Sequence, residues 1–240
     1  MCIPHQNIVS ATIGNPEEFY FLSSYGNLFN QDNRDMILRA NVTDLLHVLR
    51  QLNAGDGCKA FVYLSSSSVN LRVQTVYSRA KRAAEEVLLA LLETEGFPAI
   101  IIRPFSVTGV GEQPAHLIPT LISSCFTGAP VDFVPEPTHD FIDVEDVVDG
   151  IMALVNKAAH GIFSLGSGKQ YSNAEVLEIV ESLSGRKANI KIVDSMRPYD
   201  TDDWVSTSQD MSDSGWQPSK SLEQSIAEMI DTYRVASHAK

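Results

Sequence analysis

The chain has 240 residues, of which 44% are hydrophobic and 20% are charged, so it is long and apolar enough to bury a sizeable core. Its net charge of -12 argues against a surface that binds nucleic acid or an anionic membrane. No apolar run approaches transmembrane length, and the first residues do not read as a signal peptide. The cysteines, Cys2, Cys58 and Cys125, form no CxxC pair, so we expect a cytoplasmic protein without disulfides.

Strands and helices alternate through the first half of the chain. Short apolar runs predict buried strands, and apolar residues at helical spacing predict helices. In chain order we expect a strand at 19–24, a helix at 35–52, a strand at 59–64, a helix from 76 to about 95, and a strand at 99–103. This alternation is typical of an α/β fold with a parallel sheet covered on both faces.

The rhythm loosens after Arg103. A loop, a helix and a strand extend to Val134, and HDFIDVEDVVDGIMALV predicts a short strand that turns into a helix. GIFSLGSG predicts another strand. SNAEVLEIVESLSG and SLEQSIAEMIDTYRV predict helices, the first with Ser172 or Asn173 as its N-cap. No Pro/Gly-rich linker separates these parts.

Tyr77 and Lys81 stand one turn apart at the head of the helix that starts at 76, so they share a face. A lysine ammonium near a phenol favours the phenolate, which helps a tyrosine act as an acid/base near neutral pH. The preceding strand ends in LSSSSV, which places hydroxyls at the carboxyl edge of a parallel strand, where ligands bind in open α/β sheets. Taken singly, the pair is common on helices and a serine run is common in polar loops.

Several segments, in order, resemble the extended short-chain dehydrogenase/reductase family, the NAD-dependent nucleotide-sugar epimerases and dehydratases. FYFLSS resembles the family's fourth strand, NVTDLLHVL its asparagine helix, and YLSSSSV its serine/threonine strand. YSRAK matches Tyr-x-x-x-Lys. IIRPFSVTGVGE, HDFIDVEDVVDGI, LGSGKQYSNAEV and RPYD with SGWQPSKSLEQSI resemble later motifs. The likeness extends from about residue 19 onward and implies a Rossmann-like domain over 1–110 and mainly a small substrate-binding lobe over 111–240, interleaved with the last sheet elements.

The resemblance implies a role for each matching residue. Ser66, Tyr77 and Lys81 would be catalytic, with Tyr77 as the acid/base and Lys81 holding the nicotinamide ribose and lowering the tyrosine pKa. The residues expected at the cofactor, NAD or NADP, are Ser23, Ser24, Asn41, Ser65, Tyr77, Lys81, Pro104 and Phe105. The residues expected at a nucleotide-diphosphate sugar are Ser67, Ser106, His116, Leu117, His139, Arg197 and Asp200, with Arg197 paired to a phosphate.

The dinucleotide-binding start of the family has no counterpart here. The family opens with a Gly-x-x-Gly-x-x-Gly turn, whereas only Gly14 precedes the strand that resembles its fourth. GIFSLGSGK does not replace it as a P-loop, because Phe163 stands where that motif needs glycine. Three interpretations follow: a truncated enzyme, an enzyme completed by a partner or as a homodimer, or a remnant that no longer binds NAD.

Other departures concern the substrate. Ser67 and Ser68 occupy positions where 4,6-dehydratases carry Asp-Glu, which disfavours dehydration, and His139 replaces an arginine. The sequence therefore predicts an NAD(P)-dependent epimerase or ketoreductase of a nucleotide sugar. The alternative is a catalytically silent nucleotide-sugar-binding or scaffold protein. The histidines show no ligand spacing, so no metal site is expected, and a Gly-x-Ser-x-Gly hydrolase elbow is missing.

Overall fold

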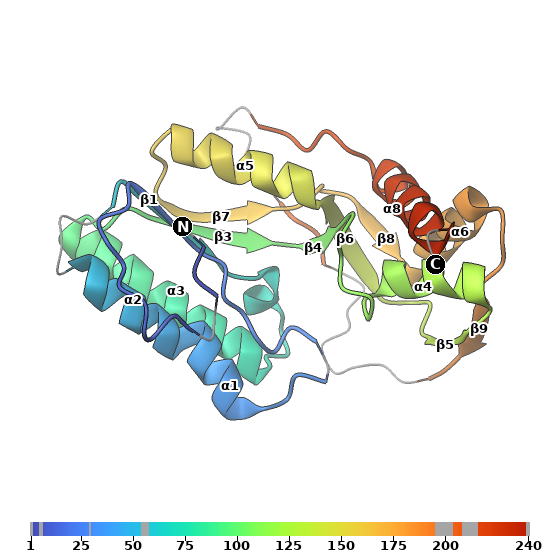
Figure 1. The fold of residues 1–240 in the computed structure, drawn as a ribbon, viewed down its shortest axis with the longest axis horizontal. Coiled ribbons are helices and arrows are strands. Elements are labelled where there is room, and N and C mark those ends of the chain that lie inside the picture. The colour runs from blue at the N-terminus through green and yellow to red at the C-terminus, as the bar shows by residue number, and fades with distance from the viewer. Residues whose placement is uncertain are drawn as a thin grey trace. The chain divides into compact units, whose positions relative to one another are not determined.

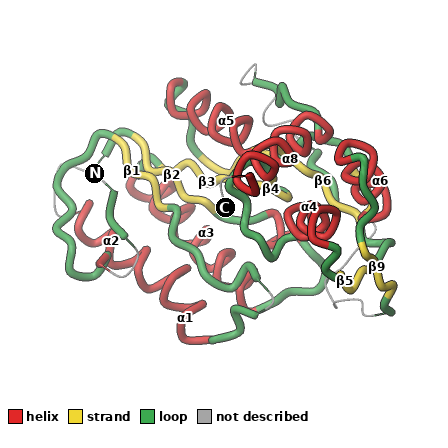
Figure 2. Tube along the Cα trace, turned by 45° about the vertical axis from the view of Figure 1, so that its right-hand side comes forward, coloured by secondary structure: helices red, strands yellow, loops and turns green. Residues whose placement is uncertain are grey.

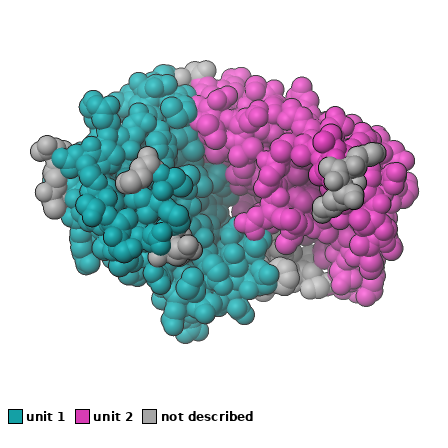
Figure 3. All heavy atoms as spheres, viewed as in Figure 1, with its two compact units in different colours: residues 1–104, 151–164 teal, residues 105–150, 165–240 magenta. Residues whose placement is uncertain are grey.

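The computed structural model describes residues 2–4, 7–28, 30–53, 58–194, 204–207 and 216–238. The chain divides into two compact units, coloured separately in Figure 3. Unit 1 comprises Met1–Pro104 and Ile151–Ser164, and unit 2 comprises Phe105–Gly150 and Leu165–Lys240. The chain thus leaves unit 1 after its third strand and returns to it once before entering unit 2 for good.

Unit 1 is built on a four-stranded sheet (Figure 1). Its strands are β1 (Glu18–Phe21), β2 (Ala60–Leu64), β3 (Ala99–Pro104) and β7 (Gly161–Leu165), in the order β1-β2-β3-β7. Both β1 and β3 run parallel to β2, with Phe61 opposite Phe19 on one side and Ala99 on the other. The predicted α/β fold with a parallel sheet is therefore confirmed.

The helical segments of unit 1 follow its strands. They are α1 (Arg34–Leu38), η2 (Arg39–Thr43), α2 (Asp44–Asn53), η3 (Ser67–Asn70) and α3 (Val76–Glu95). The single helix predicted at 35–52 is interrupted by η2, a π-helical turn, and η3 is a 3₁₀ turn. The bounds of α3 match the prediction, because Thr75 caps its start and Gly96, with φ 67°, ends it in the left-handed conformation.

The core of unit 1 lies between the sheet and helices α2 and α3, which run along the same side of the sheet in the ribbon of Figure 1 and the tube of Figure 2. Leu45, Val48 and Leu88 from the helices pack in one cluster with Phe61 and Tyr63 of β2. Burial of each such side chain contributes about 1.5–3 kcal/mol, so the β2–α3 contact is held firmly. This contact fixes the carboxyl end of β2 against the first turns of α3.

Unit 2 contains two small sheets and most of the later helices. Its strands are β4 (Ser106–Thr108), β5 (Pro130–Phe133), β6 (Thr138–Asp143), β8 (Gln170–Ser172) and β9 (Asn189–Ile192), and its helices are α4 (Leu117–Thr127), α6 (Asn173–Ser184) and α8 (Leu222–His238). Helix α5 (Val144–Asn156) begins in unit 2 and ends in unit 1. Strand β4 is parallel to β6, β8 is antiparallel to β6, and β5 is parallel to β9. Ser172 is the N-cap of α6, so the choice left open between it and Asn173 is resolved.

Among the described residues, no helix has both the length and the apolar character needed to cross a bilayer.

Candidate active site

The first turn of α3 carries the predicted tyrosine. Thr75 accepts a hydrogen bond from the Ser78 N–H, and the Ser78 hydroxyl oxygen accepts one from the Thr75 N–H, so a capping box closes the turn. Tyr77 is the second residue of the helix, and Lys81 follows one turn later on the same face. The helix start therefore sets the direction of the Tyr77 side chain.

The Tyr77 side chain is hydrogen-bonded to two serines from different segments. Its partners are Ser24, in the loop after β1, and Ser66, just after β2. Burial raises the pKa of Tyr77 above its ordinary value of 10.0, and these two hydrogen bonds lower it in part. Ser66 also shares a 2.8 Å hydrogen bond with the hydroxyl of Ser68. The phenol oxygen thus belongs to a small cluster of hydroxyl groups, the arrangement needed to pass a proton.

Lys81 is buried, with 1% of the residue exposed. Its ammonium donates a 2.7 Å hydrogen bond to the Leu64 carbonyl oxygen and lies 4.9 Å from the centre of the Tyr63 ring and 5.9 Å from that of Tyr77. Burial lowers the pKa of Lys81 to about 7, and the Glu85 carboxylate opposes that shift. The side chain therefore titrates near neutral pH.

The prediction that Lys81 lowers the Tyr77 pKa stays a prediction. Burial raises the pKa of Tyr77, and the groups that oppose the rise are Ser24 and Ser66. The physical reason is that burial disfavours the charged form of both partners, the phenolate and the ammonium alike.

Asn41 positions the loop that carries Ser24. Its amide donates to the carbonyl oxygens of Tyr25, at 2.7 Å, and Ile37, at 2.8 Å, and its oxygen accepts from the Ser24 hydroxyl at 3.4 Å. Asn41 lies in the π-helical turn η2 and is 0% exposed. The amide of Asn41 is thus committed to backbone carbonyls, and its oxygen accepts from Ser24; its predicted contact with the cofactor stays a prediction.

The serine run alternates between buried and half-buried positions. Ser65 and Ser67 are 4% and 2% exposed, whereas Ser66 and Ser68 are half-buried. The predicted contacts of Ser65 with the cofactor and of Ser67 with the substrate stay predictions. Ser66 keeps the exposure that its predicted role requires.

The remaining residues predicted at the cofactor are distributed between the units. Ser23 is half-buried in the loop after β1, and Pro104 is buried at the end of β3. Phe105 opens unit 2, is half-buried, and donates its backbone N–H to the Leu165 carbonyl oxygen at 2.9 Å. Their contacts with a cofactor remain predictions.

The described residues predicted at the substrate, other than Ser67, lie in unit 2. The Ser106 hydroxyl lies 3.4 Å from His139 Nδ1, and the His139 ring lies 5.5 Å from the Trp204 ring. His116, half-buried just before α4, pairs with Glu112 at 3.0 Å.

Three further substrate predictions have a different status. Leu117, the first residue of α4, is partly buried against the core of unit 2, and its contact with the substrate stays a prediction. Arg197 and Asp200 lie outside the described residues.

Sequence reasoning missed two charged side chains beside this site. Glu85 is 1% exposed and stands one turn after Lys81 on α3, and Arg103 of β3 pairs with it at 2.6 Å. The spacing from Tyr77 to Lys81 to Glu85, four residues each time, was a signal that the sequence offered.

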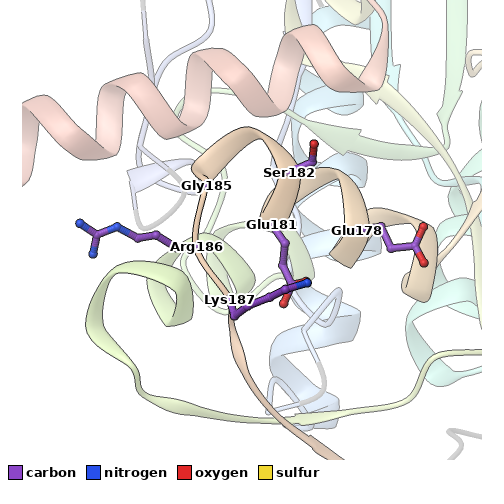
Figure 4. A pocket seen from close by; sticks show the side chains of 6 residues that line it. All are labelled: Glu178, Glu181, Ser182, Gly185, Arg186 and Lys187. Carbon is purple, nitrogen blue, oxygen red and sulfur yellow. The ribbon is translucent and has the colours of Figure 1, made fainter.

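Two surface hollows lie elsewhere, around α6 in unit 2. The larger, about 440 Å³, is lined by Glu178, Glu181, Ser182, Gly185, Arg186 and Lys187 (Figure 4). The 2.5 Å ion pair between Lys187 and Glu181 lies in it, and Arg186 points away from both glutamates. Neither hollow includes a residue predicted at the site, so we assign them no role. Within the described part of the chain, no cluster of His, Cys, Asp and Glu is arranged to hold a metal ion.

Comparison with known proteins supports the family resemblance. The sequence pattern of the NAD dependent epimerase/dehydratase family matches residues 15–166. The UDP-glucuronate 4-epimerase of Thermodesulfobacterium geofontis is 25% identical over 208 residues, which cover 80% of this chain and 64% of that protein. The chain thus spans somewhat less than two thirds of the length of this relative.

Solved structures share the fold at low identity. MoeE5 in complex with UDP-glucuronic acid and NAD superposes with a TM-score of 0.85 at 23% identity, covering 96% of this chain and 83% of that one. RMD from Pseudomonas aeruginosa complexed with NADPH gives 0.81 at 20% identity, covering 92% and 82%. At this identity the likeness establishes the fold.

Proposed function

The chain belongs to the NAD-dependent epimerase/dehydratase family, and on this premise we propose that it is an NAD(P)-dependent epimerase or ketoreductase of a nucleotide-diphosphate sugar with Tyr77 as acid/base. The observation that carries the proposal is the Tyr77 hydroxyl, bonded to Ser24 and Ser66 one helical turn before the buried Lys81. These groups come from the ends of two neighbouring parallel strands and from the helix that follows the second of them, where α/β sheets bind ligands.

The side chains act on the proton of the sugar hydroxyl. When that carbon is oxidised, Tyr77 accepts the hydroxyl proton, and it returns the proton to the carbonyl oxygen when the carbon is reduced. Ser66 holds the same oxygen through its hydroxyl and so orients it toward Tyr77. A Lys81 that carries its charge stabilises the phenolate as it forms, because opposite charges attract strongly where water is excluded.

The residues present fit one end of the cofactor. Lys81 has three N–H donors, and one of them is used by the Leu64 carbonyl, so Lys81 and Tyr77 would hold the nicotinamide ribose. The bound nicotinamide would supply hydride transfer to and from the sugar carbon. Among the described residues ahead of β1, 2–4 and 7–17, the backbone forms a short turn and irregular segments without a glycine-rich turn.

The substrate proposal rests on unit 2. We assign Ser106, His116 and His139, together with Arg197 and Asp200, to the nucleotide-diphosphate sugar. The serines at 67 and 68 favour epimerisation or ketone reduction over 4,6-dehydration. We further propose a homodimer in the cytoplasm. The second candidate function is a catalytically silent nucleotide-sugar-binding or scaffold protein.

The proposal is tested by Tyr77→Phe, with Tyr233→Phe of α8 as the matched control. Turnover of UDP-sugars or dTDP-sugars with NAD(H) or NADP(H) should fall by about 10²–10⁴-fold in Tyr77→Phe and stay unchanged in the control. Calorimetric titration of cofactor and nucleotide sugar should give affinities close to those of the parent protein. Full activity of Tyr77→Phe would refute the mechanism. Nucleotide-sugar binding without dinucleotide binding in the parent would favour the second candidate.

A further inference from the structure

Three successive residues at the end of β2 each contact a different turn of α3. The Leu64 carbonyl oxygen accepts from Lys81 at 2.7 Å, the Ser65 hydroxyl donates to Glu85 Oε1 at 2.5 Å, and Ser66 is bonded to Tyr77. On the helix the three partners stand at positions 77, 81 and 85, which share one face. The strand end and the helix are therefore matched residue by residue across the site.

Glu85 is fully engaged within this contact. Its Oε1 accepts from Ser65 and from Arg103 Nε at 2.9 Å, and its Oε2 accepts from Arg103 Nη2 at 2.6 Å. The carboxylate is 1% exposed and the guanidinium side chain 17% exposed, so the fork-to-fork pair is largely shielded from water. Arg103 Nη1 also reaches Asn70 Oδ1 of η3 at 3.4 Å. The pair thus ties β2, β3, η3 and α3 together.

From this geometry we propose that Glu85, held by Arg103 and Ser65, is a positioning residue that fixes Lys81 and Tyr77 against the end of β2 and favours the charged form of Lys81. The proposal rests on the proposed function, because it concerns the groups assigned to catalysis there. A buried ion pair gives little net stability compared with apolar residues of the same volume, so the pair is better explained by the geometry that it enforces.

The ionisable groups that face Lys81 come from three elements. Tyr63 of β2 presents its ring, and Tyr77 and Glu85 flank Lys81 on its own helix. Arg103 of β3 reaches this group through Glu85. Glu85 is the carboxylate that supports the charge of Lys81 against burial. Removing the negative charge from Glu85 should therefore weaken the ammonium form of Lys81.

The test is an NMR titration of Lys81 in protein labelled with ¹³C at the lysine side chain, with the resonance assigned by its loss in Lys81→Met. In Glu85→Gln the Lys81 pKa should fall by about one unit, the scale of one close charge. Glu86→Gln removes the same charge from the exposed neighbouring position and should leave the titration unchanged. An equal shift in both variants, or none in Glu85→Gln, would overturn the proposal.

A second variant changes Arg103, the ion-pair partner of Glu85. Arg103→Gln frees Glu85 from its partner and should raise the Lys81 pKa, opposite to Glu85→Gln, and Arg103→Lys should bring it back toward the parent value. This variant also decides the matter if Glu85→Gln does not fold. A fall in the Lys81 pKa in Arg103→Gln contradicts the proposal. Because the titration needs no turnover, failure of this proposal and failure of the proposed function are separately visible.

Discussion

Each unit of the molecule buries an ionisable side chain at 1% exposure, and the two are held differently. In unit 2, Asp140 of β6 accepts four hydrogen bonds, from the N–H and the hydroxyl of Ser167 and from the N–H groups of Gly168 and Ser206, at 2.7–3.1 Å. In unit 1, Lys81 makes one hydrogen bond, to a carbonyl oxygen. The Asp140 carboxylate therefore has four hydrogen-bond donors, whereas Lys81 bonds to one carbonyl oxygen and has a pKa that burial lowers to about 7.

The difference indicates how a structural charge is told from a reactive one. The donors around Asp140 come from backbone that this carboxylate holds in place, so the charge is used to fix a loop. Lys81 has too few polar partners to offset the desolvation of its ammonium group. Such incomplete compensation is what brings the pKa of a buried lysine close to neutral pH, where it can take part in a reaction. Burial alone therefore does not indicate function, and the number of compensating partners matters more.

The largest expected effect is the loss of stability when Asp140 is replaced. Asp140→Ala leaves three backbone N–H groups and a hydroxyl without their acceptor, and unsatisfied buried donors cost about 1–3 kcal/mol each. We expect the free energy of unfolding, measured in urea, to fall by about 3 kcal/mol. The exposed Asp149→Ala should change it little. Equal effects would mean that Asp140 does not hold its loop.

For Lys81 we expect a contribution to stability that depends on pH. Its folded-state pKa of about 7 lies below the ordinary value of 10.5, so between those values the unfolded chain binds the proton and the folded protein does not. Because of this group, the free energy of unfolding increases as pH rises between those two values. Lys81→Met lacks this gain. Between pH 7 and pH 9 the free energy of unfolding of the parent should therefore rise by about 2 kcal/mol relative to that of Lys81→Met.

Denaturation curves of both proteins at each pH measure that change. Lys59→Met is the control, because Lys59 is exposed and its ion pair with Glu17 raises its pKa, which keeps it charged through the same window. If the difference in free energy of unfolding between Lys81→Met and the parent does not change with pH, Lys81 has a purely structural role, as Asp140 does.

The parts of the fold that local signals determine were predictable from the sequence. Helix α3 has its cap at Thr75, its apolar face and its terminal Gly96 within one stretch, and its bounds agree with the prediction. The π-helical turn η2 was not predictable, because Asn41 there bonds to Tyr25, sixteen residues away. Strands β4, β8 and β9 were missed since they are short and depend on partners, β6 and β5, that lie far along the chain.

The site was predictable to a similar extent. The spacing of Tyr77 and Lys81 and a serine at the strand end were readable, and the structure brings Ser66 to Tyr77. Which serines of the run face inward was not readable, because four identical residues carry no polar–apolar alternation to set the register. Glu85 stood in the predicted helix, but its partner Arg103 comes from the next strand, and only the folded sheet joins them.

The smallest expected effect concerns the N-terminal capping boxes of two helices, one in each unit. Both α3 and α6 begin with a capping box, at Thr75 in unit 1 and Ser172 in unit 2. Thr75→Ala and Ser172→Ala should each reduce the free energy of unfolding by about 1 kcal/mol, the usual loss for such a cap. On stability alone the two units would be indistinguishable.

The two variants should differ at Tyr77, which lies two residues after Thr75. Fraying of the first turn admits water to the phenol, and since burial is what raises the pKa of Tyr77, Thr75→Ala should lower that pKa toward 10. Ser172→Ala should leave it unchanged. Titration of ¹³C-labelled tyrosine, with Tyr77→Phe to assign the resonance, measures both. If Thr75→Ala costs stability and leaves the Tyr77 titration unmoved, the environment of the phenol is set by the β2 contacts of α3 rather than by its cap.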